Sequence, residues 1–175
     1  MKHLKKLRGL LLMLPLVGGW GACGILPDVL PAETQSGKNT FGCLINGKVF
    51  IPSASGFNKG GIGKDYDGGL TVSGTAGDGK TVVFYVPNAN ATGIYSLNQK
   101  RLLAYAIEGG CSYGENTPPI KGKVIISKFE RGEDKEQNLR WLIVSGTFEG
   151  IILPDVKNCT DTIRITQGRF DVKFQ

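Results

Sequence analysis

The thiol of Cys23 is the side chain whose surroundings best define its chemistry. A basic segment, residues 1–8, is followed by an apolar run, residues 10–17, and then by glycines and Ala22. This order is typical of a signal peptide that is removed on export, and a cysteine at such a cleavage point accepts a diacylglycerol on its sulfur. The apolar run is shorter than the roughly 20 residues that span a bilayer. The sequence therefore predicts a lipoprotein signal peptide over residues 1–22 and lipidation of Cys23.

One residue departs from the usual cleavage pattern. Trp20 stands three residues before Cys23, where Leu or Val is common. The alternative is an ordinary cleavage site that leaves Cys23 as a free thiol. Two or three acyl chains on Cys23 would form a stable anchor, because each buried CH₂ contributes about 0.8 kcal/mol. The membrane is thus the first partner that the sequence predicts.

Cleavage would remove the basic excess and the only histidine. The whole chain has 21 basic and 15 acidic side chains, and four of the basic residues, with His3, lie within residues 1–22. The mature chain therefore keeps 17 basic side chains against 15 acidic ones. Nucleic-acid binding needs a clustered basic face, which the mature chain lacks. Without histidine it has no Ser-His or Cys-His pair and no histidine-ligated zinc, so we expect neither a metal nor a cofactor.

The segment from Gly74 to Thr81 matches the phosphate-binding pattern G-x-x-x-x-G-K-T. In nucleotide-binding proteins a helix follows this pattern, and its N-terminus holds the phosphates. Residues 82–86 are Val, Val, Phe, Tyr and Val, which favour a strand instead. We therefore expect no nucleotide at this segment.

Carboxylates and aromatic rings are the remaining candidates for chemistry. Two carboxylates can hydrolyse a glycosidic bond without histidine, and the candidates are Glu108, Glu115, Glu130, Glu149, Asp155, Asp161 and Asp171. An aromatic platform for a sugar or a peptide could include Tyr66, Tyr95, Tyr105, Tyr113 and Trp141. Linear spacing selects no pair of carboxylates, and core packing explains most of the rings equally well. Asp65 and Asp67 resemble the start of a calcium loop, but the later acidic ligands are missing.

Three cysteines remain besides the one at the cleavage site. A disulfide is expected in an oxidising compartment, and three cysteines allow one bridge and one thiol. Cys43 alternates with apolar neighbours, which favours a buried position on a strand, whereas Cys111 and Cys159 lie in predicted loops. We predict a Cys111–Cys159 disulfide. The alternatives are three free thiols or a bridge that includes Cys43.

An all-β domain must position these residues. Short runs of Val, Ile, Phe and Tyr alternate with glycine-rich turns over residues 39–175, and Asn46-Gly47 is a strong hairpin signal. We predict a single antiparallel β-sandwich or flattened barrel of about eight to ten strands. Residues 131–138 are predicted as a charged loop. Residues 23–38, with two prolines and no periodicity, are predicted as a tether.

The last predicted strand, residues 161–174, changes face along its length. Its apolar residues stand at odd positions up to Ile165 and at even positions from Phe170 onward. Because a slip of one residue reverses the faces of a strand, we predict a β-bulge near Gln167 and Gly168.

Two stretches of this chain resemble a known family. They are N-T-F-G-C-L-I-N-G-K at residues 39–48 and D-T-I-R-I-T-Q-G-R-F-D-V-K-F at residues 161–174. Both resemble a domain of unknown function in small lipoproteins of the Bacteroidota, and the likeness runs from about Asn39 to the end of the sequence. The resemblance implies an extracytoplasmic, lipid-anchored β domain and carries over no catalytic residue.

The expected location is the bacterial cell envelope, with the protein anchored by lipid in the outer membrane. In lipoproteins of the Bacteroidota a run of acidic residues after the cysteine often marks transport to the outer leaflet. No such run follows Cys23. The periplasmic face is therefore favoured, and the surface leaflet is the alternative.

The sequence favours a non-enzymatic function. Our leading hypothesis is a β domain that binds a ligand or partner, such as an envelope protein or a glycan. A carboxylate-based glycan hydrolase and a purely structural envelope protein are the alternatives. Two carboxylates about 5–10 Å apart in a cleft would favour the hydrolase.

Overall fold

The computed structural model describes residues 29–52, 61–98, 102–107, 110–114, 116, 119, 121–155, 159 and 161–175. The predicted signal peptide, Cys23, Glu108 and Glu115 lie outside the described residues. Over the described ranges the chain contains no helix that could cross a membrane.

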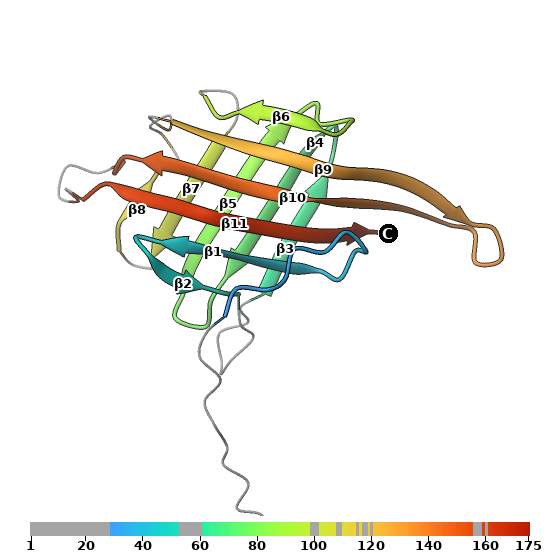
Figure 1. The fold of residues 1–175 in the computed structure, drawn as a ribbon, viewed down its shortest axis with the longest axis horizontal. Helices are drawn as coiled ribbons and strands as arrows, with labels where there is room; N and C mark the ends of the chain where they lie inside the picture. The colour runs from blue at the N-terminus through green and yellow to red at the C-terminus, as the bar shows by residue number, and fades with distance from the viewer. Residues whose placement is uncertain are drawn as a thin grey trace, which may run out of the picture.

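The described chain forms eleven strands in two antiparallel sheets (Figure 1). One sheet consists of β1 (Thr40–Ile45), β2 (Lys48–Phe50), β6 (Gly93–Ser96), β9 (Lys121–Asp134), β10 (Leu139–Ile152) and β11 (Ile163–Phe174). The other consists of β3 (Gly61–Tyr66), β4 (Gly69–Thr75), β5 (Lys80–Pro87), β7 (Leu102–Ile107) and β8 (Ser112–Tyr113). Their strand orders are β2-β1-β11-β10-β9-β6 and β3-β4-β5-β7-β8.

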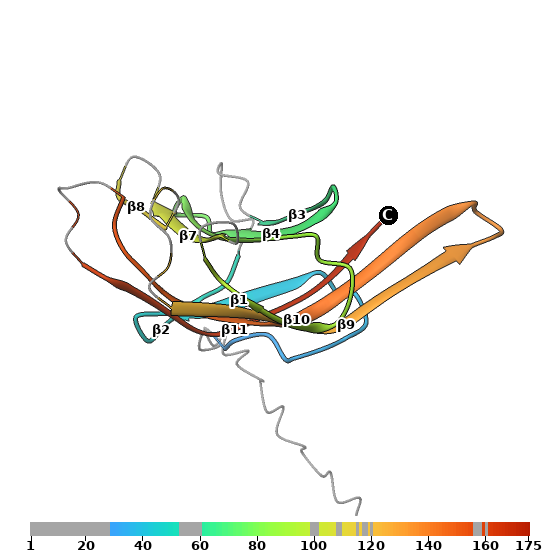
Figure 2. The same ribbon diagram turned by 90° about the horizontal axis from the view of Figure 1, so that it is seen from above.

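The two sheets are stacked as layers (Figure 2), and the strands of one run across those of the other (Figure 1). The sheets do not close into a barrel. The predicted all-β sandwich is therefore confirmed. The eleven strands exceed the predicted eight to ten because strands as short as β8, with two residues, give no clear sequence signal.

Apolar side chains from both layers form the core. Leu70 and Val72, two residues apart on β4, are both fully buried, as the alternation of faces along a strand requires. The Phe84 ring of β5 lies 5.2 Å from the Phe148 ring and 4.9 Å from the Phe170 ring of the other sheet. Such aromatic pairs contribute about 0.5–1.5 kcal/mol each beyond the area that they bury.

The predicted bulge in β11 is confirmed. The pairing of β10 with β11 shifts between Phe148 and Gly150, and the pairing of β1 with β11 shifts at the same place. Gln167 there has a left-handed φ of 50°. Beyond the bulge, Phe170 faces the core, so the following residue, Asp171, faces outward.

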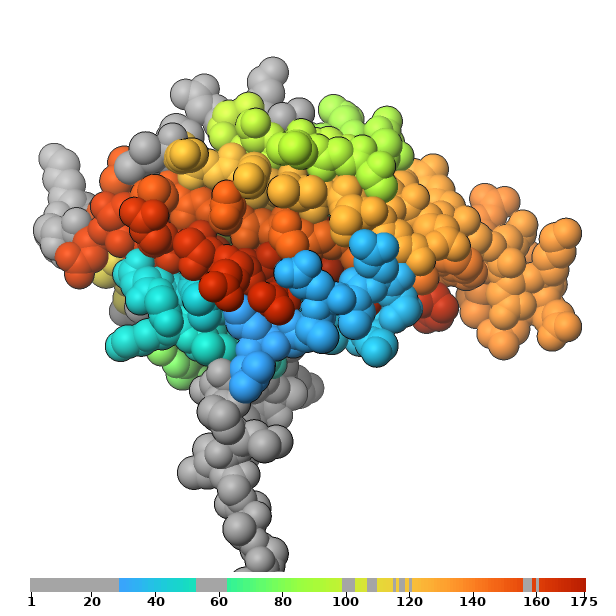
Figure 3. All heavy atoms as spheres, viewed as in Figure 1, coloured from blue at the N-terminus to red at the C-terminus, as the bar shows by residue number. Residues whose placement is uncertain are grey.

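The hairpin of β9 and β10 extends beyond the rest of its sheet. β6 pairs with β9 only over residues 123–126, and β11 pairs with β10 only from Leu142 onward. The hairpin segment 130–141, which we call the arm, projects from the sandwich (Figures 1 and 3) and bends toward the side of the five-stranded sheet (Figure 2). The prediction of a loop over residues 131–138 is therefore wrong for residues 131–134. Three of these four residues are charged and the fourth is Gly132, and a strand that projects from the core tolerates such residues.

The disulfide prediction is confirmed. Cys111 and Cys159 are bridged, with 6.0 Å between their Cα atoms. Cys43 is a free thiol that is fully buried, as its alternation with apolar neighbours predicts. Burial raises the pKa of the Cys43 thiol to about 12.

The segment from Gly74 to Thr81 is a β-hairpin. β4 ends at Thr75, a tight turn follows, and β5 begins at Lys80. The amide of Gly79 donates to the carbonyl of Ala76 across the turn, and the Lys80 ammonium pairs with Asp78. A strand therefore follows the motif, as predicted, in place of the helix that a phosphate-binding loop requires.

Candidate functional site

A groove of about 710 Å³ lies where the arm passes the edge of the five-stranded sheet. β3 contributes its end, with Lys64, Asp65 and Tyr66. The arm contributes its inner face, down to Leu142 at its base. Phe174, at the end of β11, completes the apolar part of the lining.

The register of β9 decides which arm side chains face the groove. The pairing shifts between Ser145 and Gly146, which leaves one extra residue on β9. Arg131 then lies opposite Leu142, and Glu133 lies opposite Arg140. Because Leu142 lies on the core side of β10 and faces repeat every two residues, all four side chains share the inner face.

Arg131 is held by aromatic rings. Its guanidinium carbon lies 5.3 Å from the centre of the Phe129 ring and 5.7 Å from that of Tyr66. Its Nη2 donates a hydrogen bond of 3.0 Å to the Tyr66 hydroxyl. Cation–π contacts of this kind contribute about 0.5–2 kcal/mol. The guanidinium is thus fixed in direction, and its hydrogen bond among the described residues is the one to Tyr66.

Tyr66 is itself firmly placed. Its ring meets the rings of Phe129 and Phe174 edge to face, at 5.9 and 6.2 Å, and its hydroxyl donates a 2.7 Å hydrogen bond to the carbonyl of Ala89. This residue of β3 therefore joins the edge of one sheet to the inner face of the other.

Lys64 and Lys173 add positive charge beside the groove. The Lys64 ammonium lies 5.9 Å from the centre of the Phe174 ring and donates to Asn39 Oδ1 at 2.7 Å and to the Lys173 carbonyl. Desolvation and the nearby Lys173 ammonium lower the pKa of Lys64. The Lys173 ammonium lies 5.7 Å from the centre of the Trp141 ring.

The cations of the groove lack counter-ions within the described residues. No described carboxylate lies within ion-pair distance of Lys64, Arg131 or Arg140. The lining also includes the carboxylates Asp65 and Glu133. An incoming anion can therefore meet the arginines without first breaking an ion pair.

The predicted aromatic platform is not one surface. The Tyr66 ring lies at the groove, whereas the Trp141 ring packs over Gly132 on the opposite face of the arm. Tyr105 and Tyr113 pair with each other elsewhere, with ring centres 5.9 Å apart. Tyr95 lies on β6 in the other sheet. The rings at the groove already hold cations, so they serve chiefly to place positive charge.

The candidate carboxylates that the structure describes lie on different elements. They are Glu130, Glu149, Asp155, Asp161 and Asp171. The acidic residues of the groove lining are Asp65 and Glu133. Asp65 stands between Lys64 and Tyr66, which face inward, so its carboxylate points to the other side of β3 and not toward Glu133. In the part of the chain that the structure describes, no three His, Cys, Asp or Glu side chains lie close enough to hold a metal ion.

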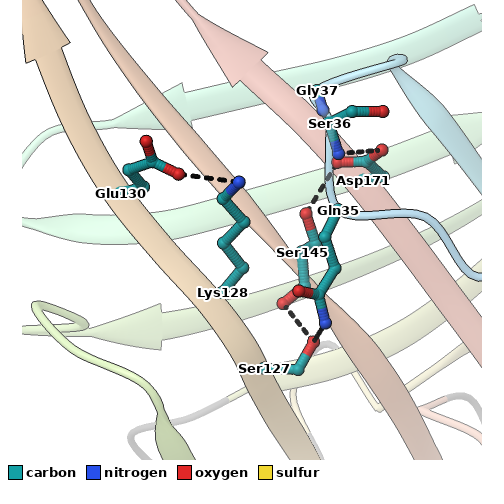
Figure 4. A network of polar contacts seen from close by, with 8 residues as sticks. All are labelled: Gln35, Ser36, Gly37, Ser127, Lys128, Glu130, Ser145 and Asp171. Carbon is teal, nitrogen blue, oxygen red and sulfur yellow. Dashed lines mark hydrogen bonds and ion pairs between the residues drawn. The ribbon is translucent and has the colours of Figure 1, made fainter.

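A second polar cluster surrounds Asp171 on the outer face of the six-stranded sheet (Figure 4). The carboxylate accepts hydrogen bonds from the hydroxyls of Thr34 and Ser145, both at 2.6 Å. It also accepts from the backbone amides of Ser36, Gly37 and Lys38, at 2.7–3.2 Å. Only 1% of Asp171 is exposed.

The hydrogen bonds to Asp171 determine its ionisation. Burial alone would raise the pKa of this carboxyl, but the hydrogen bonds from Ser145, Thr34, Gly37 and Lys38 outweigh it and lower the pKa to about 2. Asp171 is therefore charged at any physiological pH.

The Asp171 cluster holds residues 31–38, which we call the strap, against the sheet. Arg169 Nη1 donates to the Pro31 carbonyl at 3.0 Å, and Gln35 Nε2 donates to the Ser127 hydroxyl at 3.2 Å. A Cβ at position 37 would lie 2.8 Å from the Cβ of Lys173, and Gly37 has a left-handed φ of +71°. Both observations favour glycine at this position. Nothing in the sequence pairs Asp171 with this segment, which lies more than 130 residues away along the chain.

The two sheets, the groove beside the arm and the buried Asp171 carboxylate define an antiparallel β-sandwich with an open groove at one end. A family model described as a domain of unknown function, DUF6252, matches residues 62–172, and the chain belongs to this family. No curated protein and no solved structure matches the chain.

Proposed function

We propose that this protein is a lipid-anchored protein of the bacterial cell envelope that binds a ligand in the groove under the arm without transforming it. The observation that carries the binding role is the set of cations without counter-ions, Lys64, Arg131 and Arg140, which line a groove large enough for a small ligand. The fixed position of Arg131 supports this role, because a preorganised group loses little entropy when a ligand binds.

Photo-crosslinking in the native envelope tests the binding role. A photoreactive residue placed at Gln175, an exposed residue of the groove lining, should give a discrete adduct of one mass. The same residue at Arg164, an exposed position on β11 away from the groove, serves as the matched control. Identical adducts at both positions would contradict a ligand site in the groove.

A hydrolase in this groove would use Asp65 and Glu133, the two carboxylates of its lining. The double variant Asp65→Asn/Glu133→Gln separates the two functions. A binding protein should still form the adduct at position 175, and the captured molecule should have the same mass with either protein. A smaller captured molecule with the original protein than with the variant would instead support hydrolysis.

The anchor is proposed to be Cys23, which follows the basic and apolar segments of the chain. Cys23→Ser should abolish labelling by radioactive palmitate and release the protein from the membrane fraction. A variant that stays labelled and membrane-bound would contradict the lipoprotein assignment.

A further inference from the structure

We infer that the occupant of the groove is an extended, acidic segment of polypeptide that adds to the free edge of β3. This inference rests on the proposed function, because it names the class of ligand that the same groove would take.

The edge of β3 provides the first argument. β3 is the outermost strand of the five-stranded sheet and pairs with β4 along its whole length, from Gly61 opposite Thr75 to Tyr66 opposite Leu70. In the described part of the chain, no strand pairs with its other edge. The unpaired N–H and C=O groups of such an edge are a template for one more strand.

The arm provides the second argument. The six-stranded sheet continues past β3 as the arm, while the five-stranded sheet ends there (Figures 1 and 2). A strand added to β3 would lie about 4.8 Å from it. It would extend the five-stranded sheet over the inner face of the arm. Its side chains on that face would point at Arg131, Arg140 and Leu142.

The charges provide the third argument. Arg131 and Arg140 are diagonal neighbours across the hairpin, because Arg131 lies opposite Leu142, and such positions are about 7–8 Å apart. Both guanidiniums can therefore approach one carboxylate, for which arginine supplies paired donors. Glu133, on the same face, would oppose a second negative charge. A peptide that alternates acidic with uncharged residues satisfies both conditions.

The test uses synthetic peptides of six residues, the length of β3. The probe alternates glutamate with threonine. One comparison peptide has lysine in place of glutamate, and another carries N-methyl groups on alternate amides, which prevent strand pairing. A trimer of galacturonic acid supplies carboxylates without a peptide backbone. Binding to the mature protein is followed by amide chemical shifts, which report residue by residue.

Only the glutamate peptide should bind in a saturable manner and shift the amides of β3. Arg131→Gln should weaken its binding about tenfold, and Glu133→Gln should strengthen it about threefold. Arg164→Gln, which removes a positive charge outside the groove, should leave the affinity unchanged. The opposite signs at positions 131 and 133 distinguish charge recognition from a loss of folding.

Two results would overturn the inference. They are equal binding of the N-methylated peptide and absence of binding by the glutamate peptide, whether or not the galacturonate trimer binds. If the crosslinked adduct at position 175 still forms in either case, the proposed function stands and only the peptide assignment fails.

Discussion

Asp171 shows how a single carboxylate joins two distant parts of this chain. Only 1% of Asp171 is exposed, and a buried carboxylate without hydrogen-bond partners would destabilise the fold. Five hydrogen-bond donors converge on the Asp171 carboxylate. Three of them are consecutive backbone amides of the strap, which no other side chain in the described structure accepts from. The interaction therefore depends on the negative charge, and not only on the shape of the side chain.

Asp171→Asn should lower the free energy of unfolding by about 2 kcal/mol, because the amide loses the charge and cannot accept on both of its atoms. Urea denaturation at pH 7 measures this loss. Asp161→Asn, at an exposed position ten residues earlier on the chain, is the matched control and should change stability by less than about 0.5 kcal/mol. Equal losses in both variants would contradict the claim that hydrogen bonds from the strap to Asp171 stabilise the fold.

The same carboxylate predicts a dependence on pH. The folded-state pKa of Asp171, about 2, lies below the ordinary value of 3.8, so its contribution is fully present above about pH 4 and is lost as the pH falls toward 2. The stability difference between the original protein and Asp171→Asn should therefore shrink over this interval. A difference that stays constant from pH 6 to pH 2 would show that ionisation of Asp171 plays no part.

At the scale of elements, the bulge in β11 and the arm determine which side chains of the six-stranded sheet face the core, the strap and the groove. The bulge places Phe170 on the inner face and Asp171 on the outer face of the six-stranded sheet. Phe170 therefore packs in the core, and Asp171 is placed to bind the strap. The bulge was predictable, because apolar residues change from odd to even positions around it. The continuation of β9 over residues 131–134 was not, because these residues are charged or glycine and no apolar residue among them marks a strand.

Gly168→Ala tests the packing of this bulge. A Cβ at Gly168 would lie 2.4 Å from the carbonyl oxygen of Phe148, which is backbone and cannot move aside cheaply. We expect a loss of about 1–3 kcal/mol in the free energy of unfolding. Gln167→Ala, at the neighbouring exposed position, should stay within about 0.5 kcal/mol. The prediction fails if Gly168→Ala is as stable as the original protein in the same urea titration.

For the molecule as a whole, the β-sandwich and the Cys111–Cys159 disulfide were predictable from the sequence. The groove was not. Alternation and turn signals are local, so they report strands and hairpins. The groove brings together β3, the arm and the end of β11, which are far apart in sequence. Arg131 and Tyr66 meet only because the two layers cross, and no pattern along the chain encodes that contact.

The strap also changes how far the domain can lie from a lipid anchor. Residues 31–38 are held on the sheet, and only residues 24–28 stand between the proposed anchor at Cys23 and Val29. At about 3.3 Å per residue, this segment can reach only about 20 Å. An anchored domain would thus stay close to the bilayer while the arm and its groove remain at one end of the sandwich.

The fluorescence of Trp141 tests the binding role of the groove most directly. The sequence has two tryptophans, and Trp141 is the one that remains after cleavage of the predicted signal peptide. It lies on the arm between Arg140 and Leu142, and its ring packs over Gly132 on the opposite face from the groove, where it reports a change in the arm. Titration of the mature protein with a soluble envelope extract should change its emission in a saturable manner. The change should disappear in Arg131→Gln/Arg140→Gln and persist in Arg164→Gln. An emission change that does not saturate, or that is the same in the double variant, would contradict a ligand site in the groove.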